Sequence, residues 1–86
     1  MERLLSVKNG VKIMNDLVKR LANELGKTEM ANIKYDEQIN AVVINEDAIQ
    51  IFARVIHINP NFYYFKLTQE AVTIILDIQS KLEELS

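Results

Sequence analysis

The chain has 86 residues, which predicts a single small globular domain over residues 1–86. It contains no cysteine, so disulfides and zinc–thiolate sites are excluded, and a net charge of −2 argues against broad binding to nucleic acid. We find neither the pattern of a secretory leader nor an apolar run of the roughly 18 residues that a membrane span needs. We therefore expect a cytoplasmic protein without a membrane role.

Residues 2–25 carry apolar side chains at an unbroken helical spacing of three and four residues. The stripe consists of Leu4, Val7, Val11, Met14, Val18, Leu21 and Leu25. It predicts an amphipathic helix that ends near Gly26, although Gly10 inside the pattern would also suit a start near residue 10. The stripe can lie across the chain's own sheet, pair with its copy in a dimer, or insert into a different protein, and its residues are our candidates for self-association.

Residues 31–44 have the pattern of a β-hairpin. Residues 31–35 alternate apolar with polar side chains, and residues 36–38 form a polar break. Residues 39–44 are mostly apolar and β-branched, so we expect the second strand to be the more deeply buried one.

Residues 45–58 fit two structures. As a helix, the segment would be capped by Asn45 and would place its polar side chains on one narrow arc. Those side chains are Glu46, Asp47, Gln50, Arg54 and His57. As a strand, the segment has suitable β-branched residues, but each face would mix polar with apolar groups. Periodicity favours the helix, which we prefer, and residue propensity favours the strand, which stays as the alternative.

The aromatic run at residues 62–65 predicts a strand with two side chains on each face. Either the strand is buried on both faces, or one face binds a partner; stacking on single-stranded nucleic acid is a third alternative. The candidate partner-binding residues are Phe62, Tyr63, Tyr64 and Phe65.

Residues 69–85 predict a second amphipathic helix, capped by Thr68. The expected fold class is α+β: a small antiparallel sheet with long N- and C-terminal amphipathic helices packed on one face, in the order α-β-β-(α or β)-β-α. Residues 1–28 hold six basic and three acidic side chains, a net charge of +3, and residues 68–86 hold one and four, a net charge of −3. This complementarity predicts that the two helices lie close together.

The sequence offers little material for catalysis. His57 is the one histidine, and the carboxylates come as neighbours that point apart on a turn or helix, at residues 36–37, 46–47 and 83–84. No glycine-rich phosphate loop, EF-hand loop or His-Glu-x-x-His motif occurs. We therefore expect no enzyme activity, no cofactor, no metal and no small-molecule substrate.

These observations predict a non-catalytic protein–protein interaction module, an adaptor, inhibitor or regulator, that forms a homodimer and binds another protein. The alternative is a nucleic-acid-associated regulator that uses the aromatic strand 62–65 or the basic face of the N-terminal helix. That basic face comprises Lys8, Lys12, Lys19 and Arg20. Salt dependence separates the two hypotheses, because phosphate contacts weaken steeply with added salt whereas apolar contacts do not.

Overall fold

A computed structural model describes the backbone of residues 2–26, 32–46, 48–62 and 67–85. The elements in chain order are α1 (Glu2–Gly26), β1 (Ile33–Asp36), β2 (Ala41–Ile44), β3 (Ile49–Ile51), β4 (Ile56–Ile58), the short 3₁₀ helix η1 (Pro60–Phe62) and α2 (Gln69–Leu85).

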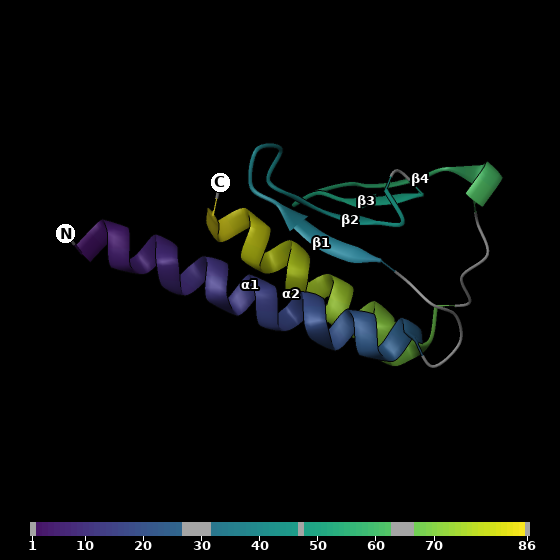
Figure 1. Ribbon diagram of the computed structural model, residues 1–86, viewed down its shortest axis with the longest axis horizontal. Helices are drawn as coiled ribbons and strands as arrows, with labels where there is room; N and C mark the ends of the chain where they lie inside the picture. The colour runs from purple at the N-terminus through teal and green to yellow at the C-terminus, as the bar shows by residue number, and fades with distance from the viewer. Residues whose placement is uncertain (1, 27–31, 47, 63–66, 86) are drawn as a thin grey trace.

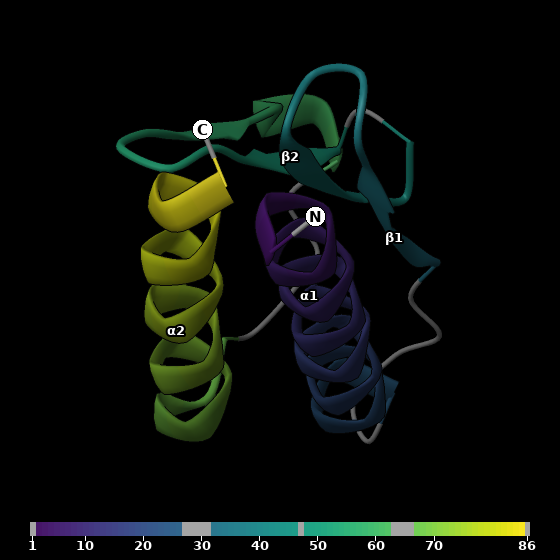
Figure 2. The same cartoon turned by 90° about the vertical axis from the view of Figure 1, so that its left-hand side faces the viewer.

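The elements form two layers (Figures 1 and 2). The strands form a four-stranded antiparallel sheet in the order β1-β2-β3-β4, so each strand pairs with its neighbour in the sequence. The two helices run antiparallel to each other, and both cover the same face of the sheet. The predicted α+β fold is therefore confirmed, including the packing of the last helix beside the first.

The core lies between the sheet and the two helices. Its buried members are Met14, Leu17, Val18, Leu21 and Leu25 of α1, Val42, Ile44, Ile49 and Ile51 of the strands, and Ala71, Ile74, Ile75, Ile78 and Leu82 of α2. On each helix these residues recur at spacings of three and four, which is the periodicity that predicted the helices. The expected burial of the second strand is also confirmed, because all of β2 is buried.

Thr68 ties the start of α2 to the end of α1. Its hydroxyl oxygen accepts a hydrogen bond from the amide of Ala71 at 3.1 Å, which confirms the predicted N-cap. The same hydroxyl donates to the carboxylate of Glu24 on α1, also at 3.1 Å. One side chain thus satisfies a backbone donor of α2 and fixes the position of that end against α1.

Gly10 marks the place where α1 passes the other end of α2. A Cβ atom built on Gly10 would lie 2.5 Å from Cδ2 of Leu85, so glycine permits the close approach. The helix continues through this residue to Glu2, and a start near residue 10 is wrong. The first turns of α1 extend beyond the end of α2 (Figure 1).

The preferred prediction of a helix over residues 45–58 is wrong, because this segment forms β3, β4 and the tight turn between them. The two strands are separated by a turn at residues 52–55, so the inward and outward positions change phase between them. Ile49 and Ile51 on β3 lie opposite Ile58 and Ile56 on β4, and Gln50 lies opposite His57. Each strand therefore separates apolar from polar side chains, although one continuous strand would not.

The aromatic run begins differently from the prediction. Phe62 is the last residue of η1 rather than the first of a strand, and Tyr63, Tyr64 and Phe65 lie outside the described residues. Pro60 has a backbone angle that suits the start of a helical turn. The side chain of Asn59 accepts a hydrogen bond from the amide of Asn61 at 3.1 Å, which favours a turn here over a strand.

Candidate functional site

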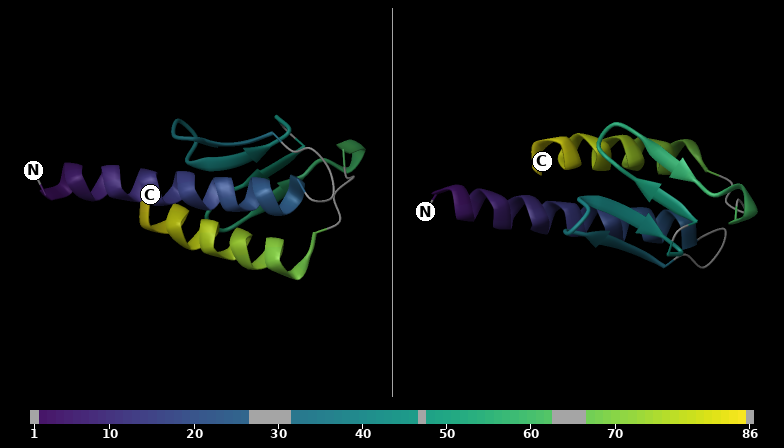
Figure 3. Two further views of the ribbon diagram at one scale, coloured as in Figure 1. Left: turned by 60° about the horizontal axis from the view of Figure 1, so that its bottom comes forward. Right: turned by 90° about the horizontal axis from the view of Figure 1, so that it is seen from above.

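The helices leave one face of the sheet open (Figure 3). Residues paired directly across antiparallel strands point to the same face. Val43 lies opposite Lys34 on one side and Gln50 on the other, and Gln50 lies opposite His57. On β2 and β3, the residues on either side of Val43 and Gln50 belong to the core. The row formed by Lys34, Val43, Gln50 and His57 therefore lies on the open face.

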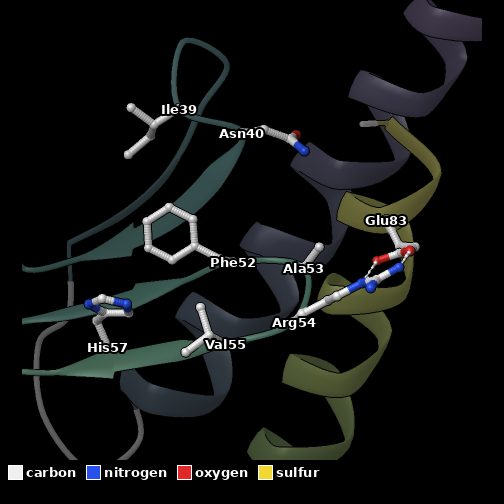
Figure 4. A pocket seen from close by; sticks show the side chains of 8 residues that line it. All are labelled: Ile39, Asn40, Phe52, Ala53, Arg54, Val55, His57 and Glu83. Carbon is white, nitrogen blue, oxygen red and sulfur yellow. Dashed lines mark hydrogen bonds and ion pairs between the residues drawn. The ribbon is translucent and has the colours of Figure 1, made fainter.

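A hollow of about 570 Å³ lies on this face, at the end where the β1–β2 and β3–β4 turns meet (Figure 4). Its lining residues are Ile39, Asn40, Phe52, Ala53, Arg54, Val55, His57 and Glu83. The side chains of Ile39 and Val55 are 45% and 49% exposed, although both are large and apolar. We call the surface formed by Ile39, Phe52, Val55 and His57 the open-face site.

The β3–β4 turn sets the position of Phe52 in this site. The amide of Phe52 donates to the carbonyl of Val55 at 2.8 Å, which closes the turn. The carbonyl of Phe52 accepts a hydrogen bond from the side-chain amide of Gln79 on α2 at 3.0 Å. The ring of Phe52 meets the ring of His57 edge-on, with 5.4 Å between the centroids. Backbone hydrogen bonds and a side chain of α2 thus fix the position of Phe52 in the site.

Arg54 and Glu83 form the charged rim of the hollow. The guanidinium donates to both carboxylate oxygens, at 2.7 Å and 3.1 Å. This hydrogen bonding, together with the opposite charge, lowers the pKa of Glu83 and raises the pKa of Arg54. Both groups stay ionised near neutral pH, and their fork-to-fork geometry fixes the β3–β4 turn over the end of α2.

The β1–β2 turn carries Ile39 into the site. Asn40 adopts a left-handed φ of 50°, a conformation that asparagine tolerates better than most residues. Its side-chain oxygen accepts a hydrogen bond from the hydroxyl of Tyr35 at 2.7 Å. Burial, followed by the charges of Glu37 and Asp36, raises the pKa of Tyr35, which keeps the hydroxyl protonated as a donor.

The candidate self-association residues of α1 serve mainly the core of one chain. Met14, Val18, Leu21 and Leu25 are buried against α2 and the sheet, so they are not free to contact a second copy. Val11 is half-buried, and the side chains of Leu4 and Val7 lie outside the described part. The alternative in which the stripe packs within its own chain therefore accounts for the four buried members.

The basic face proposed for nucleic acid has mixed charge. Lys12, Lys19 and Arg20 are exposed on α1, but Asp16 lies among them at helical spacing and is exposed as well. The side chain of Lys8 is outside the described residues. This face therefore presents no continuous positive surface over the part that the structure describes.

The open-face site was not predicted from the sequence. Phe52, Val55 and His57 belong to the segment that was interpreted as a helix, and Ile39 was placed in a buried strand. The signal that could have found them is the alternation Val55-Ile56-His57-Ile58, considered as a strand separate from residues 49–51.

Within the described ranges, no group of three histidine, aspartate or glutamate side chains is placed to hold a metal ion. No described helix combines the length and apolar character that crossing a bilayer requires. No protein-family model, curated protein or solved structure matches this chain.

Proposed function

We propose that this chain is a non-catalytic protein–protein interaction module, an adaptor, inhibitor or regulator, that binds another protein through the open-face site. The observation that carries the proposal is the gathering of exposed apolar side chains on the sheet face opposite α1 and α2. Ile39 and Val55 are each about half-exposed, at 45% and 49%, and the ring of Phe52 lies between them. Burying such side chains against a partner is favourable, and clusters of them commonly mark binding surfaces.

The shape of the site favours a protein over a small molecule. A small-molecule site encloses most of its ligand, roughly 70–90% of the ligand's surface. Here Ile39 and Val55, which form part of the walls, are themselves about half-exposed, so the hollow is a depression in the sheet surface. An apolar side chain that projects from another protein would fill this depression while the surrounding surface contacts the rest of that protein.

The rim supports the same proposal. Arg54 and Glu83 neutralise each other at the edge of the hollow, so a partner need not bring a charge of its own. An apolar centre with a polar rim is the usual anatomy of a protein–protein interface. Because the partner would be held mainly by apolar contacts, its binding is expected to persist at high salt, in contrast to binding through phosphates.

Affinity capture with matched variants tests this function. The chain is used as bait in its wild-type form, as Val55→Asp, and as the control Ile13→Asp, whose altered residue is 44% exposed on α1. We expect at least one protein to be retained by the wild type and the control, at low and high salt, and to be lost with Val55→Asp. Equal capture by all three baits, or capture that disappears with added salt, would contradict the proposal.

A further inference from the structure

Among the residues that the structure describes, no strand pairs with the outer edge of β4. In an antiparallel pair, hydrogen-bonded and non-hydrogen-bonded residue pairs alternate. Phe52 bonds Val55 at one end of the β3–β4 ladder, and Asn59 bonds Ala48 at the other. The alternation therefore places the hydrogen-bonded pair within β4 at His57, and it turns the N–H and C=O groups of Ile56 and Ile58 away from β3.

The two edges of the sheet differ in their protection against pairing. Edge strands of soluble proteins usually carry charged side chains that discourage another strand from adding to them. The β1 edge has two, Lys34 and Asp36, whereas β4 consists of isoleucine, histidine and isoleucine. Of the two edges, β4 is therefore the one suited to accept another strand.

Exposed apolar side chains occur both on β4 and on α2. Ile56 and Ile58 lie opposite the core residues of β3, so they point to the helix side, yet both are exposed. On α2, Val72 and Leu76 are 41% and 59% exposed. They share one helical stripe with Gln79 and Glu83, which bond the β3–β4 turn, so this stripe lies on the β4 side of the molecule.

From these relationships we infer that β4 pairs antiparallel with β4 of a second copy about a twofold axis at His57, joining the two sheets into one. The sequence Ile-His-Ile reads the same in both directions, so each Ile56 meets Ile58 of the partner subunit and exchanges backbone hydrogen bonds with it. The pairing also brings together the exposed stripes of the two α2 helices beneath the sheet. No lysine, arginine, aspartate or glutamate lies within β4, so the strand pair itself brings no like charges together.

The second copy is favoured over an unrelated peptide because the edge is complementary to itself. A one-residue shift from the central register would leave donors opposite donors, and a two-residue shift would pair only one of the isoleucines. The inference deepens the proposed function, since self-pairing is one form of protein binding. The open-face sites of both copies would then lie on the same side of a continuous sheet.

Cysteine cross-linking tests the pairing, because the chain has no cysteine of its own. His57 would face His57 of the partner subunit in a non-hydrogen-bonded pair, with the Cα atoms about 4.5 Å apart, inside the roughly 4.4–6.8 Å range of disulfides. The variant His57→Cys is compared with Lys34→Cys, which places the same thiol at the centre of the opposite edge. Each purified variant is oxidised mildly at micromolar concentration and examined on a non-reducing gel.

We expect His57→Cys to form a covalent dimer at least tenfold faster than Lys34→Cys, and sedimentation equilibrium of the wild type to give a dimer. Adding Leu76→Lys should abolish the cross-link, whereas adding Ile13→Lys should leave it unchanged, since both positions are exposed but only Leu76 belongs to the α2 stripe on the β4 side. A wild-type monomer, equal cross-linking of the two cysteine variants, or faster cross-linking of Lys34→Cys would overturn the inference. The experiment involves no other protein, so it can fail while binding at the open-face site stands.

Discussion

The side-chain amide of Asn40 donates a hydrogen bond to the carbonyl oxygen of Leu82, 3.1 Å away, and so joins the β1–β2 turn to the last turn of α2. The carbonyls in the last turn of a helix have no partner within the helix, and Asn40 satisfies one of them. Because Ile39 is the preceding residue, the same bond positions one wall of the open-face site. This hydrogen bond therefore ties the open face of the sheet to the C-terminal end of α2.

Replacing Asn40 should destabilise the fold by two separable effects. Asn40→Gly keeps the left-handed φ of 50° but loses the bonds to Leu82 and Tyr35, and we expect a loss of roughly 1–3 kcal/mol. Asn40→Ala adds the cost of a left-handed residue, about 1 kcal/mol more. Urea unfolding of both variants measures these losses. Equal stability of the glycine variant and the wild type would mean that neither bond contributes.

Leu21 should be among the most sensitive positions of the core, because its side chain is fully buried on α1. We expect Leu21→Ala to lower the free energy of unfolding by about 2–5 kcal/mol through lost burial and the cavity left behind. The control Ile13→Ala, on the exposed side of the same helix, should change it by no more than about 0.5 kcal/mol. Thermal unfolding measures the loss of stability in both variants. Similar losses would contradict the structure, in which Leu21 is buried and Ile13 is exposed.

The sequence was sufficient for the parts of the fold that depend on long periodic patterns. Both helices and the β1–β2 hairpin follow from apolar spacing, and Thr68 caps α2 as its hydroxyl predicts. The segment 45–58 was misinterpreted because its polar residues also match a helical arc. The turn between β3 and β4, centred on Ala53 and Arg54, contains none of the glycine, proline or asparagine residues that usually indicate a turn.

The open-face site was hidden by the same misinterpretation. Gln50 and His57 are seven residues apart, which fits two turns of one helix, yet they meet as partners across two strands. Ile39 was assigned to a buried strand because it begins the apolar run at residues 39–44, but it lies in the turn that leads into β2. Local patterns do not determine which strand pairs with which, and this pairing brings Ile39, Phe52 and Val55 together.

The Arg54–Glu83 pair predicts a small effect of acid on stability. The pKa of Glu83 is lowered from its ordinary value of 4.5 in the folded chain, so the pair contributes fully above that value. The contribution should disappear as the pH falls from 4.5 through the lower folded pKa. Melting temperatures of wild type and Glu83→Gln, measured against pH, should therefore converge in acid. Curves that stay parallel below pH 4.5 would contradict this assignment.

The β2–β3 loop contains a position where glycine should stabilise the fold. Glu46 has a φ of 64°, a left-handed conformation that costs a non-glycine residue roughly 1–2 kcal/mol. Glycine removes this cost but gains freedom in the unfolded chain, so we expect Glu46→Gly to add on the order of 0.5 kcal/mol.

The matched control is Asn45→Gly, at a φ of 48°. Asn45 accepts a hydrogen bond from the amide of Asn32 at 2.8 Å, which the glycine variant would lose, so no gain is expected there. Chemical denaturation compares the two variants, and a loss of stability in Glu46→Gly would show that the left-handed conformation is not costly in this loop.

The central claim is that a protein partner docks on the open face of the sheet rather than on α1. Amide chemical-shift mapping tests it most directly, with the isotope-labelled chain titrated with the protein that wild-type bait captures and Val55→Asp bait does not. We predict that the largest shifts occur at Ile39, Phe52 and Val55, around the hollow. Shifts confined to the exposed face of α1, around Lys12 and Lys19, would contradict the claim.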